Sequence, residues 1–185
     1  MVAQDIKRYN FALLPTQRAE TYIDVAQRYF KHHAVGYLLG AHSLPHITVC
    51  QFHALESVLP ALMKGIQGVN TSPRVQLADL RFSNKPNTNL WGASLSVQRS
   101  HELLILQQAV VSLLAAQGLA PLNPVGDLYT PHMTLAKVDA VDLKDFPKSI
   151  FEPNKFSLAL GESDVLGQFT KVLHRFAQAK PPPAP

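Results

Sequence analysis

The chain has 185 residues, of which 46% are hydrophobic and 16% are charged, and it carries a formal net charge of +4 at pH 7. This length predicts one domain, and the apolar content is enough to bury a core, which excludes a disordered chain. The small basic excess suits a short anionic ligand better than a long nucleic-acid duplex. Cys50 is the only cysteine, which excludes an internal disulfide and a zinc site built from a cysteine cluster.

The first half of the chain predicts the order strand, helix, strand, strand, short helix, strand. The long helix is predicted because apolar residues recur every three or four positions along one face. Thr16 stands where a helix N-cap is expected. The expected elements are a strand over 9–15, a helix over 17–32, strands over 35–40 and 46–52, a short helix over 57–66 and a strand over 74–82.

The second half predicts a similar order of elements. Ser100 is the expected N-cap of its long helix, and Gly118 follows the last helical residue, Gln117. The expected elements are a strand over 90–96, a helix over 100–117, a strand over 132–138, a short helical piece near 141–149 and a strand over 155–161. We therefore predict an internal repeat over about 8–82 and 89–161, followed by a closing strand over about 169–176.

The ends of the chain and its hydropathy give further expectations. Residues 178–185 are rich in proline and are predicted to form a flexible tail after a domain that covers residues 1–177. No apolar run approaches the roughly 18 residues of a membrane span, so no membrane partner is expected. The N-terminal residues lack the apolar segment of a secretion signal, so we expect a cytoplasmic location. No obligate protein partner is implied, and we expect a monomer.

One short motif occurs at the same place in both halves. Residues 45–49 read Pro-His-Ile-Thr-Val and residues 131–135 read Pro-His-Met-Thr-Leu. A single His-x-Thr match is weak evidence, because this composition gives one by chance about 0.35 times. Two copies with matching flanks at equivalent points of a repeat indicate a shared function.

Residues i and i+2 of a strand lie on the same face, so each motif presents an imidazole beside a hydroxyl. These pairs are His46 with Thr48 and His132 with Thr134. Two histidines that flank one ligand supply a general base and a general acid near pH 7, and two threonine hydroxyls donate hydrogen bonds to phosphate oxygens. The pattern predicts phosphodiester cleavage without a metal or another cofactor, and it leaves open which histidine is the acid.

The paired motifs, their spacing and the duplicated element order resemble the 2H phosphoesterase superfamily. The nearest resemblance is to its RNA 2′,3′-cyclic phosphodiesterase branch, historically called 2′-5′ RNA ligases, and it covers residues of about 8–177. The resemblance implies an α+β fold with two pseudo-symmetric lobes, each a small, mostly antiparallel sheet with outer helices, around a central cleft. It also implies that RNA 3′ ends or cyclic nucleotides are the substrates. His46, Thr48, His132 and Thr134 match the family's catalytic positions one for one.

Three other residues lie near the motifs. Lys137 stands where family members often carry a basic residue that binds substrate, although strict alternation along a strand points it away from His132. Tyr129 precedes the second motif by three residues and is a candidate to stack on a nucleobase, with core packing as the alternative. Cys50 shares the predicted face of His46 but lies about 13 Å along the strand, so we interpret it as a small buried residue.

Other functions remain open from the sequence. A zinc site would need His42, His46 and His53, but strand spacing does not bring these rings onto one ion and no carboxylate or cysteine set completes the site, so no metal is expected. A non-catalytic module that binds nucleotides or RNA ends is an alternative in another class. A third alternative keeps the chemistry but changes the substrate to 2′-5′ oligonucleotides or small cyclic nucleotides.

Overall fold

The computed structural model describes residues 5–84, 88–141 and 145–176. In the first half, its elements are β1 (Ile6–Pro15), α1 (Ala19–Phe30), β2 (Ala34–Leu38), β3 (Ile47–Leu55), the 3-10 turn η1 (Glu56–Val58), α2 (Leu59–Gly65) and β4 (Leu77–Asn84). In the second half, they are β5 (Trp91–Val97), α3 (His101–Ala116), η2 (Gly126–Leu128), β6 (His132–Val138), η3 (Lys148–Phe151), β7 (Phe156–Ser163) and β8 (Phe169–Arg175).

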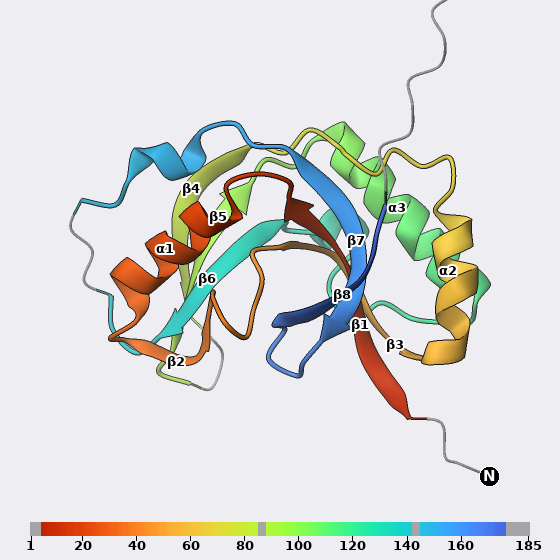
Figure 1. Cartoon of the computed structure of the whole chain (residues 1–185), viewed down its shortest axis with the longest axis horizontal. Coiled ribbons are helices and arrows are strands. Elements are labelled where there is room, and N and C mark those ends of the chain that lie inside the picture. The colour runs from red at the N-terminus through yellow and green to blue at the C-terminus, as the bar shows by residue number, and fades with distance from the viewer. Residues whose placement is uncertain (1–4, 85–87, 142–144, 177–185) are drawn as a thin grey trace, which may run out of the picture.

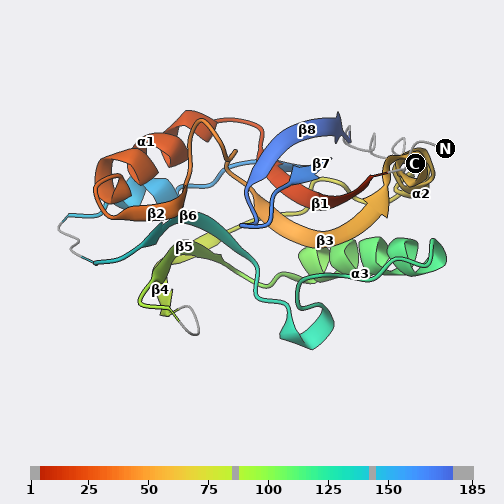
Figure 2. The ribbon, with the colours of Figure 1, turned by 90° about the horizontal axis from the view of Figure 1, so that it is seen from below.

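The strands form two four-stranded antiparallel sheets (Figure 1). The order is β3-β1-β7-β8 in the first, which we name sheet I, and β2-β6-β5-β4 in the second, which we name sheet II. Helix α1 packs against β6 of sheet II, and α3 packs against β3 of sheet I. Figure 2 shows these two helices on opposite outer faces of the molecule. The predicted α+β fold with two mostly antiparallel sheets and outer helices is confirmed.

The two sheets do not coincide with the two halves of the sequence. Three strands of sheet I, β3-β1-β7, have the same order as their repeat equivalents β6-β5-β4 in sheet II. The first half therefore contributes both β2 and β4 to sheet II, and the second half contributes β7 to sheet I. In each set of three equivalent strands, one strand comes from the other half of the chain. The fourth strands, β8 of sheet I and β2 of sheet II, are not equivalent to each other in the repeat.

The apolar residues of the two motifs lie in one continuous core. Ile47 and Val49 of β3 and Met133 and Leu135 of β6 are all fully buried in the same cluster. Burial of these side chains fixes which face of each strand is exposed, because a shift of one residue would move every side chain to the other face. The alternate residues His46, Thr48, His132 and Thr134 are thus directed away from the core.

The helix ends test the capping predictions. Ser100 accepts a hydrogen bond from the amide of Leu103, and Gly118 has φ of +68°, so the predicted start and stop of α3 are confirmed. The prediction that Thr16 caps α1 is wrong, because the N-cap is Arg18. Thr16 instead donates from its amide and its hydroxyl to the carbonyl of Lys155, which continues the pairing of β1 with β7.

The remaining structural expectations concern two short segments and the membrane. The helical piece expected near 141–149 is partly outside the described residues, and the described helical turn there is η3, which begins at Lys148. The proline-rich segment 178–185 lies outside the described residues. Within the described part of the chain, none of the helices has the length and apolar character that crossing a membrane requires.

Candidate active site

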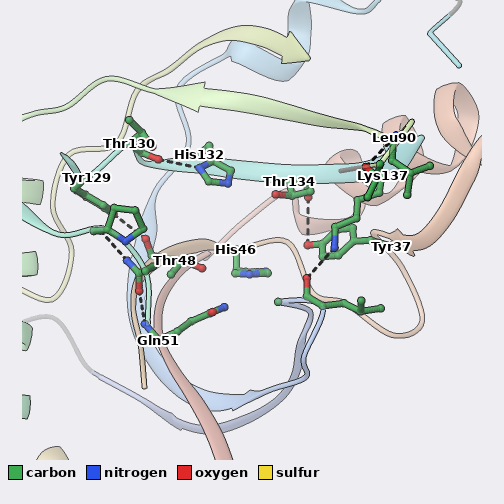
Figure 3. A pocket seen from close by; sticks show the side chains of 15 residues that line it. Tyr37, His46, Thr48, Gln51, Leu90, Tyr129, Thr130, His132, Thr134 and Lys137 are labelled. Carbon is green, nitrogen blue, oxygen red and sulfur yellow. Dashed lines mark hydrogen bonds between the residues drawn. The ribbon is translucent and has the colours of Figure 1, made fainter. Parts of the chain in front are cut away.

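Both His-x-Thr motifs line a single cavity of about 420 Å³ (Figure 3). The cavity is bordered by β2 and β6 of sheet II and by β3 and the β7–β8 loop of sheet I. His46, Thr48, His132 and Thr134 all contribute to its wall. Strands β3 and β6 belong to different sheets but contact each other, so residues that are far apart in the sequence share one site.

Each motif histidine is held by the same main-chain contact. Nδ1 of His46 lies 2.8 Å from the carbonyl oxygen of Leu44, and Nδ1 of His132 lies 2.8 Å from that of Thr130. A carbonyl oxygen only accepts, so Nδ1 carries the proton in both hydrogen bonds. The ring of His46 also has a main-chain hydrogen bond with Gly167, which lines the cavity. The proline of each motif stands between the histidine and this carbonyl, where its fixed φ favours the turn before the strand.

A β-bulge follows the threonine in each copy of the motif. In the pairing of β1 with β3, the partners change from Phe11 with Cys50 to Ala12 with Thr48, which leaves one extra residue on β3. In the pairing of β5 with β6, the partners change in the same way from Ala93 with Ala136 to Ser94 with Thr134. The extra residue interrupts the alternation of faces, so two consecutive side chains enter the core in each strand.

The bulges change which residues reach the cavity. Cys50 is fully buried, so its interpretation as a small buried residue is confirmed, and burial raises the pKa of its thiol to about 12. The expectation that it shares the face of His46 is wrong, because the bulge turns its side chain into the core and it does not line the cavity. Lys137 is not directed away from the site as strict alternation requires, but lines the cavity together with Thr134. Gln51 lines the cavity at the equivalent position of the first motif. Sequence reasoning missed Gln51, although it stands three residues after Thr48, as Lys137 does after Thr134.

Lys137 gives one end of the cavity a positive charge. Its Nζ donates to the carbonyl of Leu166 at 3.3 Å and lies 5.9 Å from the centre of the Tyr37 ring (Figure 3). None of the described residues that line the cavity is an aspartate or a glutamate. A cation, hydroxyls and imidazoles without an opposing carboxylate favour an anionic ligand.

Two tyrosine hydroxyls donate hydrogen bonds to the main-chain carbonyls of the two motif threonines. The hydroxyl of Tyr129, next to the second motif, donates to the carbonyl of Thr48 at 2.8 Å. The hydroxyl of Tyr37, on β2 before the first motif, donates to the carbonyl of Thr134 at 3.5 Å. Both rings are buried, and burial raises the pKa of Tyr37 to about 12 and also raises that of Tyr129, so both hydroxyls stay protonated. Tyr129 borders the cavity, but its hydroxyl holds main chain and its ring packs in the core.

The two histidines have different surroundings. The side chain of His46 is only 5% exposed and its ring packs against Phe169, with 5.5 Å between the ring centres. The pKa of His46 is lowered to about 4, mainly because the ring is buried. The nearby ring of His132 also lowers this pKa, and main-chain hydrogen bonds with Leu44 and Gly167 act in the opposite direction. His46 is therefore neutral near pH 7. The ring of His132 is exposed to solvent.

The described residues do not form a metal cluster. Within residues 5–84, 88–141 and 145–176, no group of three or more His, Cys, Asp or Glu side chains is arranged to hold a metal ion. His42 and His53, which a zinc site at His46 would need, do not line the cavity.

Comparisons with known proteins give matches only among solved structures. No protein-family model matches the chain, and neither does any curated protein. Escherichia coli LigT complexed with 3′-AMP is 18% identical with a TM-score of 0.61, covering 95% of this chain and 100% of LigT. A structure described as a phosphoesterase is 16% identical with a TM-score of 0.59, covering 95% and 100%. The MHV ns2 PDE domain is 12% identical with a TM-score of 0.50, covering 82% and 86%. The resemblance seen in the sequence is thus confirmed at the level of the fold, and this chain has the two-lobed fold of LigT and the 2H phosphoesterases.

Proposed function

We propose that this protein is a metal-independent phosphodiesterase that hydrolyses 2′,3′-cyclic phosphates at RNA or nucleotide ends. The observation that carries the proposal is the arrangement of His46, Thr48, His132 and Thr134 around one cavity, with both imidazoles held by equivalent bonds at Nδ1. The fold supports it, because LigT with the same fold has been crystallised with 3′-AMP and with phosphate. A binding module would not need two titratable groups on opposite strands.

In the proposed reaction, His46 is the general base and His132 is the general acid. Nε2 of neutral His46 accepts a proton from water while the water oxygen forms a bond to phosphorus. The bond from phosphorus to one ribose oxygen breaks, and Nε2 of protonated His132 gives its proton to that oxygen. Negative charge that develops on the phosphoryl group raises the basicity of His46 as the proton moves. Thr48 and Thr134 donate hydrogen bonds to the non-bridging oxygens.

The same arrangement accepts a second nucleophile. An RNA 5′-hydroxyl in place of water would form a phosphodiester instead of a phosphomonoester. With a 2′,3′-cyclic phosphate as the other reactant, opening at the 3′ oxygen gives a 2′-5′ linkage, which is 2′-5′ RNA ligase activity. The proposal therefore includes this ligation, with hydrolysis as the main reaction because water is the more abundant nucleophile.

The direct test is a product analysis with 2′,3′-cyclic nucleotides and an RNA oligonucleotide ending in a 2′,3′-cyclic phosphate, both in excess EDTA. We expect turnover to a single 2′- or 3′-monoester, because imidazoles and hydroxyls supply the proton transfer and the charge stabilisation. The His46→Asn/His132→Asn double variant is the blank. Binding without turnover would favour the module that only recognises RNA ends. Activity that EDTA abolishes and Zn²⁺ or Mg²⁺ restores would contradict the metal-free mechanism.

Lys137→Gln is expected to weaken binding of nucleotide 3′-monophosphates by about tenfold at low salt, because it removes a charge-assisted hydrogen bond to the phosphate. The difference in affinity between the wild type and Lys137→Gln should become smaller as the salt concentration rises, because salt screens the attraction between the Lys137 charge and the phosphate. Titration calorimetry at two salt concentrations measures both effects. Lys171→Gln is the matched control, because Lys171 is exposed on β8 and pairs with Glu162. An equal loss in both variants would assign the effect to net charge and not to the cavity.

A further inference from the structure

Strand β1 contains one amide within a run of buried residues. All seven positions from Tyr9 to Pro15 are buried, and Asn10 is 0% exposed. β1 lies beside β3 in sheet I (Figure 1), so the side chains of this strand reach the first motif. A carboxamide in such a place is costly, because a buried polar group must find a partner for each of its atoms.

The amide of Asn10 has one strong contact, and this contact is with the cavity wall. Nδ2 of Asn10 donates to Oγ1 of Thr48 at 3.1 Å. The other atom of the amide, Oδ1, is buried and has no hydrogen-bond partner among the described residues. An apolar side chain of similar size would avoid this unsatisfied acceptor, so packing and stability do not explain an asparagine at position 10.

The contact determines how the Thr48 hydroxyl is used. A hydroxyl has one proton and two lone pairs, and the NH₂ group of an amide only donates. Asn10 therefore occupies a lone pair of Oγ1 and leaves the hydroxyl proton directed elsewhere. The carbonyl of Thr48 is held by Tyr129, so both the main chain and the side chain of this residue are positioned.

Within the described residues, the second motif has no contact equivalent to the one between Asn10 and Thr48. In the strand register Asn10 pairs with Gln51, and the equivalent residue of β5, Gly92, pairs with Lys137. A glycine has no side chain, so this position gives the Thr134 hydroxyl no amide donor like Asn10. The two threonines therefore differ in how firmly they are oriented, although their positions in the repeat are equivalent.

We propose that Asn10 is a positioning residue that orients the Thr48 hydroxyl as a hydrogen-bond donor to a non-bridging phosphate oxygen in the cavity. This inference rests on the proposed function. Asn10 itself does not line the cavity, and it acts only through Thr48.

The test is a double-mutant cycle with Asn10→Leu and Thr48→Ala, assayed on a 2′,3′-cyclic nucleotide. Asn10→Leu should lower kcat/KM by about tenfold, the size expected for one hydrogen bond to a charged group. In the Thr48→Ala background, it should cause no further loss, because its effect passes through that hydroxyl. The melting temperature of Asn10→Leu should equal or exceed that of the wild type, because the unsatisfied acceptor is removed. Leu13→Met, at a buried position of the same strand that faces the core, controls for altered packing.

Asn10→Asp tests whether position 10 must donate a hydrogen bond to Thr48 or only needs to be polar. At a pH high enough to ionise this buried carboxyl group, its oxygens only accept. The Thr48 proton should then turn toward the introduced carboxylate and away from phosphate, and kcat/KM should fall below that of Asn10→Leu. Wild-type activity in Asn10→Asp would overturn the inference. So would wild-type activity in Asn10→Leu, or an equal loss with and without Thr48.

Binding of inorganic phosphate, measured by calorimetry, gives a readout that does not depend on turnover. Asn10→Leu should bind phosphate more weakly than the wild type, and Leu13→Met should not. If the wild type fails to turn over cyclic phosphates, the proposed function is refuted, while this binding comparison still decides the role of Asn10. Equal phosphate affinity in the wild type and Asn10→Leu would refute that role.

Discussion

Replacing either motif histidine with asparagine is expected to lower kcat on a 2′,3′-cyclic nucleotide by about 10²–10⁴-fold, the usual contribution of one general acid or base. Asparagine is chosen because its amide can keep the bond that Nδ1 makes to Leu44 or Thr130. KM should change much less, because Thr48, Thr134 and Lys137 still surround the phosphate. Steady-state kinetics of His46→Asn and His132→Asn measure both quantities.

The double variant gives the internal control for this prediction. Its loss should be smaller than the product of the two single losses, because groups that act in one proton-transfer sequence are not additive. A circular-dichroism spectrum and a melting curve for each variant show whether it is folded. Turnover close to the wild type in a folded His46→Asn or His132→Asn protein would remove that residue from the mechanism.

The second large effect concerns stability in acid. The pKa of His46 is about 4 in the folded protein, against 6.5 for the free side chain, because the ring is buried. Between these values the unfolded chain binds a proton that the folded chain does not, so the free energy of unfolding falls as the pH falls from 6.5 toward 4. At about 1.4 kcal/mol for each pH unit, the total loss is about 3 kcal/mol. Urea unfolding at a series of pH values measures it.

His46→Asn should remove this part of the acid destabilisation, since asparagine does not titrate. The wild type, measured in parallel under the same conditions, serves as the comparison. A wild-type slope in His46→Asn would show that other groups cause the loss of stability. The same burial keeps the folded His46 neutral from pH 7 down to its pKa of about 4.

Local patterns in the sequence were enough to predict most elements and the central residues of the site. The long helices follow from helical periodicity, and the cap of α3 follows from Ser100 with its hydroxyl acceptor. The duplicated motif placed His46 and His132 at equivalent positions, and the structure brings both into one cavity. These features depend on neighbouring residues in the chain, which a single sequence shows directly.

The features that the sequence did not reveal depend on contacts between distant strands. An extra residue at a bulge is visible only in the pairing with β1 or β5, so simple alternation placed Cys50 toward the site and Lys137 away from it. The pairing of β4 and β7 with strands of the opposite half is likewise non-local. The low pKa of His46 comes mainly from burial, and its ring packs against Phe169 of β8, which is distant in the sequence.

Because both halves belong to one chain, substitutions in one motif are independent of substitutions in the other. If identical halves associated as a symmetric dimer, every substitution would appear twice, and both imidazoles would have the same environment. In this chain, the two halves vary independently, so His46 is buried and His132 exposed, while Gln51 and Lys137 occupy equivalent positions with different charge. Covalent duplication thus permits the two equivalent histidines to have different chemical environments within a pseudo-symmetric fold. A ligand bound between them can then be held in one orientation only.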